Sequence, residues 1–229
     1  MGSGPITALV PMKAHSERVP GKNVLDFVGK PLFHWIFEAL RSSRYIDRIV
    51  VNTDSAEIGE EATARFGARV LWRPTHLCGD MIGIQPLIEW DLEHSDGTTY
   101  LQTHCTNPLL TADTIDAACE RFRRKGDHDS LFSVTQLQTR LYWSDAAPIN
   151  HDPLRLVRTQ DLDPVFEENS CIYLFSRTTF ERCHHRIGSR PILFPISPLE
   201  AVDIDEPHDL AIAGAIMRQR LGEGDTRVR

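Results

Sequence analysis

The chain of 229 residues is 41% hydrophobic and 25% charged, which is the ordinary usage of a globular protein that buries one substantial core. Its net charge of -7 and pI of about 5.8 argue against nucleic acid or an anionic membrane surface as the main partner, because both require a clustered excess of Lys and Arg. We therefore expect neither partner, and any anionic ligand must be met by local positive charge.

The cysteines and the chain ends indicate a cytoplasmic protein. The cysteines are odd in number and form no CxxC pair, so a secreted disulfide framework is not expected. No apolar run approaches the ~20 residues that span a bilayer, and the start has no signal-peptide pattern. Residues 1–4 are expected to be a tag remnant, and the polar residues 222–229 a flexible tail. The cysteines are Cys78, Cys105, Cys119, Cys171 and Cys183.

The hydrophobic pattern predicts alternating strands and helices over the first 134 residues. In chain order we expect a strand at 7–11, a helix at 32–40, strands at 49–52 and 69–72 around a helix at 58–66, a helix at 84–92, a strand at 99–103, a helix at 112–122 and a strand at 131–134. Asp54, with Glu57 three residues on, predicts a capping box at the start of the second helix. This alternation favours an α/β fold whose sheet is parallel or mostly parallel, with helices on both faces.

The alternation stops after residue 136 and resumes near residue 170. Residues 137–168 are rich in polar residues and Pro and show no helical pattern, which indicates an excursion from the sheet. We predict one domain over residues 5–221, with 137–170 as the excursion. Its last elements are expected to be a strand at 171–175, a helix at 178–183, a strand at 192–194 and a helix at 209–221.

The loop at residues 11–23 follows the first predicted strand and carries Lys13, Arg18, Gly21 and Lys22. Loop amides together with Lys and Arg side chains can cradle phosphate groups. The loop has neither the GxxxxGK[ST] spacing of a Walker loop nor the GxGxxG spacing of a dinucleotide fingerprint. A solvated basic turn is the alternative interpretation.

Two carboxylates are predicted to share one face near the C-terminal end of the domain. If residues 201–207 are extended, Asp203 and Asp205 point one way while Val202 and Ile204 point into the core. Paired carboxylates suit Mg²⁺, which completes its octahedron with water and substrate phosphates. Alternatively, Asp205 merely caps the helix that begins at Pro207, although that leaves Asp203 without a role.

A polar run, Gln102-Thr103-His104-Cys105-Thr106-Asn107-Pro108, ends the fourth predicted strand. Ligands of open α/β sheets bind beyond the carboxyl ends of strands, so this run is a candidate binding loop. His104 beside Cys105 could indicate a nucleophile or a zinc site, but supporting ligand spacing is absent and a structural histidine is favoured. The same holds for Cys183-His184-His185, where we do not expect a metal.

The three loops also carry an ordered set of motifs. Residues 12–23 align without a gap with the known motif Ala-Arg-x-x-Ser-Lys-x-x-Pro-x-Lys-Asn. Lys13 stands in place of the Arg of this motif, and Glu17 in place of its first Lys. In these motifs the sequence resembles the acylneuraminate cytidylyltransferase family, which includes CMP-sialic acid synthetases and is related to the enzymes that activate 3-deoxy-manno-octulosonate. The resemblance spans about Ala8 to Met217. Its other matches are Asn52-Thr53-Asp54, Arg73-Pro74 with Leu77 and Asp80, Thr106-Asn107-Pro108-Leu109, Arg158, Gln160, Glu168-Asn169-Ser170 with Ile172-Tyr173, and Asp203-Ile204-Asp205 with Pro207, Asp209 and Leu210.

The resemblance implies a doubly wound, Rossmann-like fold of the nucleotide-diphospho-sugar transferase type. It also implies that the excursion helps to build a homodimer and lends residues to the sugar site. It implies that the anomeric hydroxyl of a sialic-acid-like 2-keto-3-deoxy sugar attacks the α-phosphorus of CTP, and pyrophosphate leaves. The nucleotide residues would be Lys13, Ser16, Arg18, Lys22, Asn23, Arg73 and Asp80. The sugar residues would be His104, Thr106, Asn107, Arg158, Gln160 and Asn169. Asp203 and Asp205 would hold Mg²⁺, and with Lys13, Arg18 and Lys22 they would form the catalytic set.

Departures from the family pattern bear on the acceptor. Lys13 keeps the charge of Arg but loses its bidentate fork, Glu17 reverses a charge that Arg18 can restore, and Leu110 stands where sialic acid synthetases carry Arg. The His104 loop also differs from the commoner Gln-Pro-Thr-Ser. We hypothesise that catalysis survives and that the sugar differs from N-acetylneuraminate. The alternatives are a phosphonate or shorter keto-deoxy acid as acceptor, or a catalytically silent nucleotide-binding protein, against which the retained aspartates argue.

Overall fold

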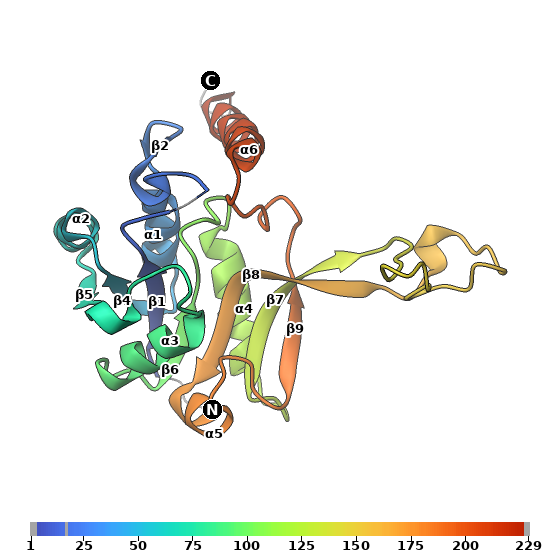
Figure 1. Cartoon of the computed structure of the whole chain (residues 1–229), viewed down its shortest axis with the longest axis horizontal. Coiled ribbons are helices and arrows are strands. Elements are labelled where there is room, and N and C mark those ends of the chain that lie inside the picture. The colour runs from blue at the N-terminus through green and yellow to red at the C-terminus, as the bar shows by residue number, and fades with distance from the viewer. Residues whose placement is uncertain (1–3, 17, 227–229) are drawn as a thin grey trace.

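The computed structural model describes residues 4–16 and 18–226 of the chain. Within this part, a seven-stranded sheet with the order β5-β4-β1-β6-β8-β7-β9 forms the centre of the body (Figure 1). The neighbours β5, β4, β1 and β6 are parallel, β8 is antiparallel to both β6 and β7, and β9 is parallel to β7. The strands are β1 (Ile6–Met12), β4 (Ile46–Thr53), β5 (Arg69–Trp72), β6 (Thr99–Gln102), β7 (Ser130–Leu137), β8 (Val165–Ser176) and β9 (Pro191–Pro195).

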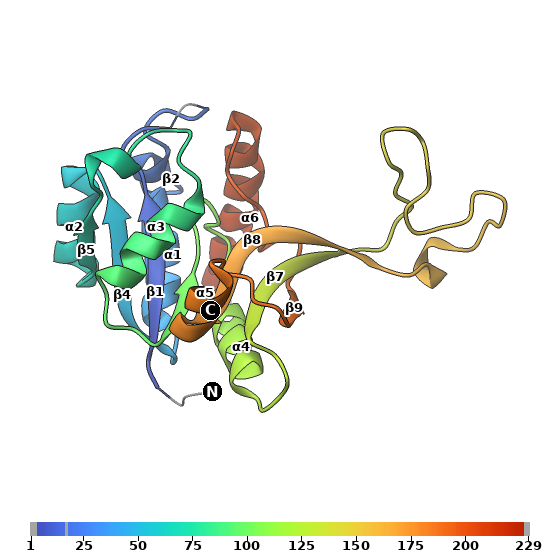
Figure 2. The same cartoon turned by 60° about the horizontal axis from the view of Figure 1, so that its bottom comes forward.

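Helices cover both faces of the sheet (Figure 2). Helices α1 (Leu32–Ser42), α2 (Ala56–Phe66) and α4 (Ala112–Arg123) bury apolar side chains in one core cluster. Helices α3 (Ile84–Glu93) and α5 (Arg177–Cys183) close the opposite face. Helix α6 (Pro207–Thr226) forms a third cluster with Phe27, Leu32 and Leu109, which fixes the segment before it against the body. The doubly wound, mostly parallel fold predicted from the sequence is confirmed.

The start of α2 differs from the predicted capping box. Ser55, not Asp54, is the N-cap, and its side chain accepts a hydrogen bond from the Ile58 amide. Asp54 instead accepts from the Ala14 amide at 2.7 Å. The capping prediction was therefore wrong by one residue, because the Asp54 carboxylate turns toward the loop after β1 and anchors it.

Other differences from the predicted elements are small. Strand β8 begins at Val165, so the excursion rejoins the sheet earlier than expected, and α6 continues past Leu221 to Thr226. A two-stranded ribbon of β2 (Asp26–Phe27) and β3 (Lys30–Pro31) was not predicted. Three short 3₁₀ turns, η1 (Lys22–Val24), η2 (Thr75–Leu77) and η3 (Thr159–Asp161), lie in loops. Residues 1–3 and 227–229, from the expected tag remnant and tail, lie outside the described residues, as does Glu17.

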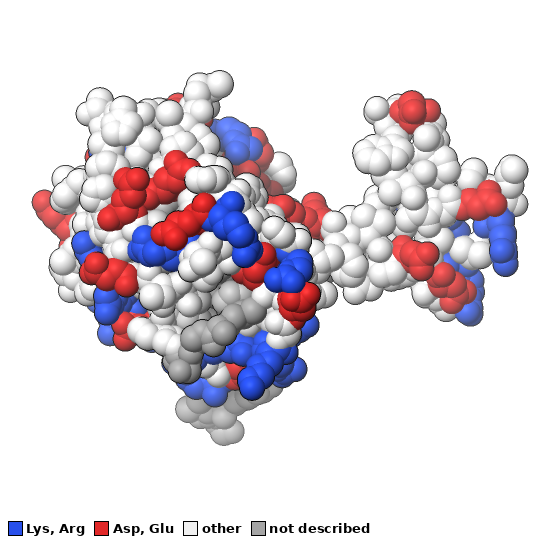
Figure 3. Space-filling model, turned by 90° about the horizontal axis from the view of Figure 1, so that it is seen from below, with Lys and Arg blue, Asp and Glu red and all other residues white. Residues whose placement is uncertain are grey.

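Residues 138–164 project from the body as an arm between β7 and β8 (Figures 1 and 3). The arm has few elements of its own: a bridge between Tyr142 and Pro148 and the turn η3. Several of its large apolar side chains face solvent, and Leu154 and Leu156 are 95% and 82% exposed. No helix in the described part of the chain has the length and apolar character needed to cross a bilayer.

Candidate active site

A cavity of about 500 Å³ opens where the loops after β1 and β6 meet the segment before α6. It brings together residues that are far apart in the sequence, as expected for the carboxyl edge of a parallel sheet. From the predicted nucleotide set, its walls contain Lys13, Ser16, Arg18, Lys22, Asn23 and Asp80. From the predicted sugar and metal sets, they contain His104, Thr106, Asp203 and Asp205.

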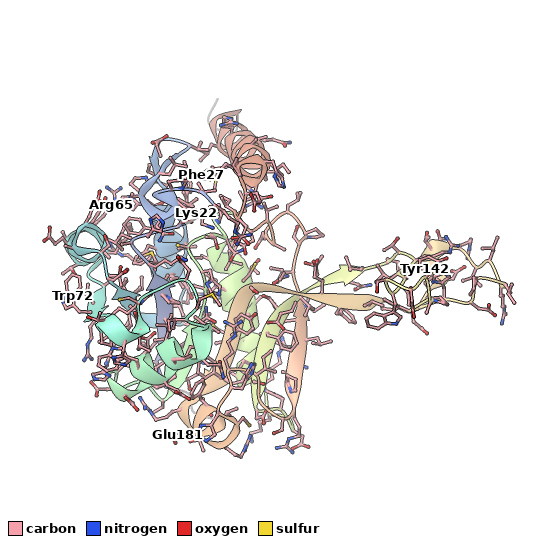
Figure 4. All side chains as sticks on the ribbon, in the orientation of Figure 1. Lys22, Phe27, Arg65, Trp72, Tyr142 and Glu181 are labelled. Carbon is pink, nitrogen blue, oxygen red and sulfur yellow. The ribbon has the colours of Figure 1, made fainter. Side chains whose placement is uncertain are left out.

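Lys22 is the most buried cation of this cavity. Gly21 adopts a left-handed conformation with φ of 64°, which a residue without a Cβ allows, and η1 begins directly after it. The Lys22 side chain is only 10% exposed, and its Nζ donates to the Ile204 carbonyl at 2.5 Å and to Asp205 Oδ1 at 3.1 Å. Figure 4 shows Lys22 on the body of the molecule, away from the arm. The burial of this ammonium contradicts the alternative of a solvated basic turn.

Arg18 reaches the same carboxylate from the solvent side. Its guanidinium lies 3.0 Å from Asp205 Oδ1, and the charge of Asp205 raises the pKa of Arg18. The opposite wall has a second ion pair, between Lys13 and Asp80. Three cations therefore converge on one cavity, each paired with a carboxylate.

The carboxylate of Asp203 is only partly satisfied by hydrogen bonds. Within the described residues its Oδ1 is buried without a hydrogen-bond partner. Burial raises the pKa of Asp203, and a hydrogen bond from the Thr106 side chain opposes this shift. Ile204 between the two aspartates is fully buried in the α6 cluster, and Val202 packs against that cluster, as the alternating pattern predicted.

The structure contradicts the alternative that Asp205 caps α6. Asp209 takes that role, because its Oδ2 accepts from the backbone amides of Asp205 and Glu206 at 3.0 Å and 2.7 Å. Asp203 and Asp205 are thus left to face the cavity. Among the described residues no group of three or more His, Cys, Asp or Glu side chains could hold a metal. Two carboxylates, one with an orphaned oxygen, fit an ion such as Mg²⁺ that takes its other ligands from water and phosphates.

Asn23 and Cys105 hold the floor of the cavity together. Asn23 donates from Nδ2 to the Lys13 carbonyl at 2.8 Å, and its Oδ1 accepts from Cys105 Sγ at 3.0 Å. Burial raises the pKa of Cys105 to about 12, so the group is a neutral thiol at neutral pH. Because the thiolate is the reactive form, this argues against Cys105 as a nucleophile.

His104 lines the part of the cavity next to β6 and β8. Its Nε2 lies 3.0 Å from Gln102 Nε2. Burial, and next the charge of Arg186, lowers the pKa of His104 to about 4, so the imidazole is neutral at physiological pH. Ser170, which adopts a φ of 60°, also lines the cavity. Sequence reasoning included Ser170 in a motif match but gave a site role only to its neighbour Asn169, and it missed Arg186.

Three other predicted residues lie behind the cavity wall. Arg73 donates to the Asn52 side chain and carbonyl at 2.8 Å and 3.0 Å. Asn107 is fully buried and donates to the Val202 carbonyl at 3.5 Å. Asn169 accepts from Ser133 at 2.6 Å. None of these three residues lines the cavity.

Arg158 and Gln160 are not brought to the cavity of their own chain. Both lie on the arm, where Arg158 pairs with Asp161 at 2.7 Å and Gln160 belongs to η3. Figure 4 shows how far the arm, marked by Tyr142, lies from Lys22. Neither residue is among those that line the cavity.

A sequence model of the family described as "Cytidylyltransferase" matches residues 7–207. The chain belongs to the cytidylyltransferase family. A "CMP-N,N'-diacetyllegionaminic acid synthase" of Legionella pneumophila is 30% identical over 93% of this chain and 96% of its own length. An "N-acylneuraminate cytidylyltransferase" of Oncorhynchus mykiss is 27% identical over 91% of this chain and 49% of its own length, so this cytidylyltransferase spans about half of that relative.

A solved structure supports the fold independently of the sequence. The "CMP:2-keto-3-deoxy-manno-octonic acid synthetase complexed with CTP" superimposes with a TM-score of 0.69 at 16% identity, covering 95% of this cytidylyltransferase and 100% of the other chain. At that identity the likeness concerns the fold. Leu110 is buried in the main core cluster and brings no charge to the site.

Proposed function

We propose that the protein is a nucleotidyltransferase that transfers CMP from CTP to the anomeric hydroxyl of an acidic 2-keto-3-deoxy sugar of the nonulosonate class, with release of pyrophosphate. The observation that carries the proposal is that Asp203, whose Oδ1 has no hydrogen-bond partner among the described residues, lines the same cavity as Asp205, Lys13, Arg18 and Lys22. This combination of cations with paired carboxylates suits a metal-bound triphosphate. The names of the relatives, each said of its own protein, support CTP and an acidic sugar as substrates.

Each group has a defined task in this reaction. Lys13, Arg18 and Lys22 bind the triphosphate and stabilise the charge that moves onto the departing pyrophosphate. Asp203 and Asp205 would hold Mg²⁺, which would supply neutralisation of the α-phosphate and a lower pKa for the attacking hydroxyl. His104 and Thr106, on the β6 side, would position the sugar. Phosphorus–oxygen bond formation and cleavage then depend mainly on this positioning.

The identity of the reaction is tested by incubating the protein with Mg²⁺, each of four ribonucleoside triphosphates and a panel of 2-keto-3-deoxy acids. Mass spectrometry detects the products. We expect a CMP conjugate and pyrophosphate with CTP and with no other triphosphate, and we expect a sugar other than N-acetylneuraminate to be preferred. Turnover only with a phosphonate or a shorter keto-deoxy acid would contradict the sugar class. CTP binding without turnover on any acceptor would favour a silent nucleotide-binding protein.

We further propose that the protein is a cytoplasmic homodimer in which the arm of one copy reaches the cavity of the other. The five cysteines are all free thiols, which supports a reducing compartment. The exposed Leu154 and Leu156 at the end of the arm support a contact with another surface. Exchange of arms would bring the partner's Arg158 and the partner's Gln160 toward the sugar.

Replacing Leu154 and Leu156 together by Asp should convert the dimer into a monomer, because two charges would be placed in an apolar contact. Light scattering after size exclusion measures the mass. Leu199→Asp is the matched control, since Leu199 is an exposed leucine on the body. An unchanged dimeric mass in the double variant would contradict a contact through the arm, and a monomeric wild-type protein would contradict the dimer itself.

A further inference from the structure

Arg186 is a buried cation beside the cavity that the reaction described above does not use. Its side chain is 11% exposed, and the nearest carboxylate, Glu168, lies 3.7 Å away and is itself half-exposed. The guanidinium lies over the Tyr173 ring, 3.5 Å from its centroid, and NH1 donates to Gln102 Oε1. Burial of a charge whose counter-ion is this distant costs free energy, so we expect the guanidinium to have a role in the neighbouring site.

Arg186 fixes the orientation of the Gln102 amide. A guanidinium has donors only, so the atom of Gln102 that faces it must be the carbonyl Oε1. On the other side, Gln102 Nε2 donates to the Thr103 carbonyl at 3.1 Å, a partner that only accepts. Gln102 is also fully buried, so water offers no alternative. The two ends of the amide therefore cannot exchange.

The fixed amide in turn determines which nitrogen of His104 carries the proton. The atom 3.0 Å from His104 Nε2 is the Gln102 amide nitrogen, which can only donate. His104 Nε2 must then accept and has no proton, and the proton of the neutral ring lies on Nδ1. Within the described residues no hydrogen bond engages Nδ1, although His104 lines the cavity.

We infer that Arg186 and Gln102 are positioning residues that hold His104 as its Nδ1–H tautomer, so that it offers the sugar a hydrogen-bond donor. This inference rests on the proposed function for the ligand. A donor-only edge recognises an oxygen that accepts, such as the carboxylate or an acylamino carbonyl of an acidic sugar. This edge offers no acceptor to an ammonium group, which also only donates. The contacts from Arg186 through Gln102 to His104 therefore determine specificity through the position of the proton on the His104 ring, and not through the shape of the cavity alone.

The tautomer can be measured directly without any ligand. Long-range proton–nitrogen NMR of the wild-type protein should show the Nδ1–H pattern for His104, assigned from the resonance lost in His104→Gln. Arg186→Met removes one of the two contacts that fix the Gln102 amide and leaves only the Thr103 carbonyl, so the population of the Nε2–H tautomer should rise. Arg190→Met is the matched control, because Arg190 is an exposed arginine whose guanidinium pairs with Asp127.

Gln102→Glu provides a second test that keeps the Arg186 charge paired. The introduced carboxylate only accepts, so His104 should place a proton on Nε2. Retention of the Nδ1–H pattern in both Arg186→Met and Gln102→Glu would overturn the inference, whatever the enzyme does. The second variant covers the case in which Arg186→Met does not fold.

Kinetics separate positioning from a purely structural role. In both variants KM for the acidic sugar should rise about tenfold through loss of one hydrogen bond to a charged or polar group, while KM for CTP stays unchanged and Arg190→Met matches the wild type. Equal effects on both KM values would contradict the inference. Absence of turnover in the wild type would instead overturn the proposed function and leave the NMR result standing.

Discussion

Asp203→Asn should lower kcat on the order of 1,000-fold, because loss of one metal-holding carboxylate removes several kcal/mol of charge stabilisation. The substitution preserves size, replaces one accepting oxygen by a donating amide nitrogen and removes the negative charge. Asp203 also has the orphaned oxygen of the pair, whereas Asp205 already binds Lys22 and Arg18. Pyrophosphate release in saturating CTP and Mg²⁺ measures the effect, and Asp205→Asn should show a loss of similar size.

The same substitution should stabilise the protein without Mg²⁺. Burial raises the pKa of Asp203 above its ordinary value of 3.8. A raised folded-state pKa contributes stability that is fully present below the unfolded pKa and lost as pH rises through the folded one. Asn has no carboxyl to ionise, so Asp203→Asn does not lose this stability as pH rises. Its Tm should therefore exceed that of the wild type at pH 7.5, and the difference should vanish near pH 3, where Asp203 is protonated.

Asp209→Asn is the control for both measurements. Asp209 belongs to the same motif, but it accepts from two backbone amides at the start of α6, which the Asn oxygen can also do. It should retain turnover close to that of the wild type. If Asp203→Asn turned over as fast as Asp209→Asn, the metal assignment would be wrong even if the reaction were right.

The sequence predicted the sheet because its strands and helices follow different hydrophobic periods. Strand β5 at Arg69–Trp72 was predicted to the residue, and Asp203 with Asp205 was predicted to share a face from the burial of Val202 and Ile204. These are local patterns. The Asp54 capping box failed because two adjacent polar residues, Asp54 and Ser55, could each begin the helix, and tertiary contact with Ala14 decided between them.

What the sequence could not provide is the pairing between distant segments. Arg186 follows a histidine pair with no visible motif, and its importance depends on Gln102, 84 positions earlier in the chain. The arm was predicted as an excursion, but its direction away from the body was not, because a polar, Pro-rich segment has no periodicity that specifies direction. Arg158 and Gln160 lie on this arm, inside the predicted excursion, and their role in a sugar site stays a prediction.

Lys22→Met should lower kcat/KM for CTP by about 100-fold to 1,000-fold, the range for losing one preorganised group that stabilises developing charge. Lys22 is 10% exposed and Arg18 is 56% exposed. A buried ammonium is less screened by solvent, so Arg18→Met should cost less than Lys22→Met although both remove one positive charge.

Steady-state kinetics with varied CTP at saturating sugar provide the comparison, and thermal unfolding provides the control for folding. Lys22→Met should also lower Tm without ligand, since the Ile204 carbonyl loses its partner and Asp205 loses one of two cations. Lys22→Arg keeps the charge but places a larger planar group in a confined site, so it should restore only part of the activity. Equal losses in Lys22→Met and Arg18→Met would mean that net charge at the cavity, and not the buried position of Lys22, determines triphosphate binding.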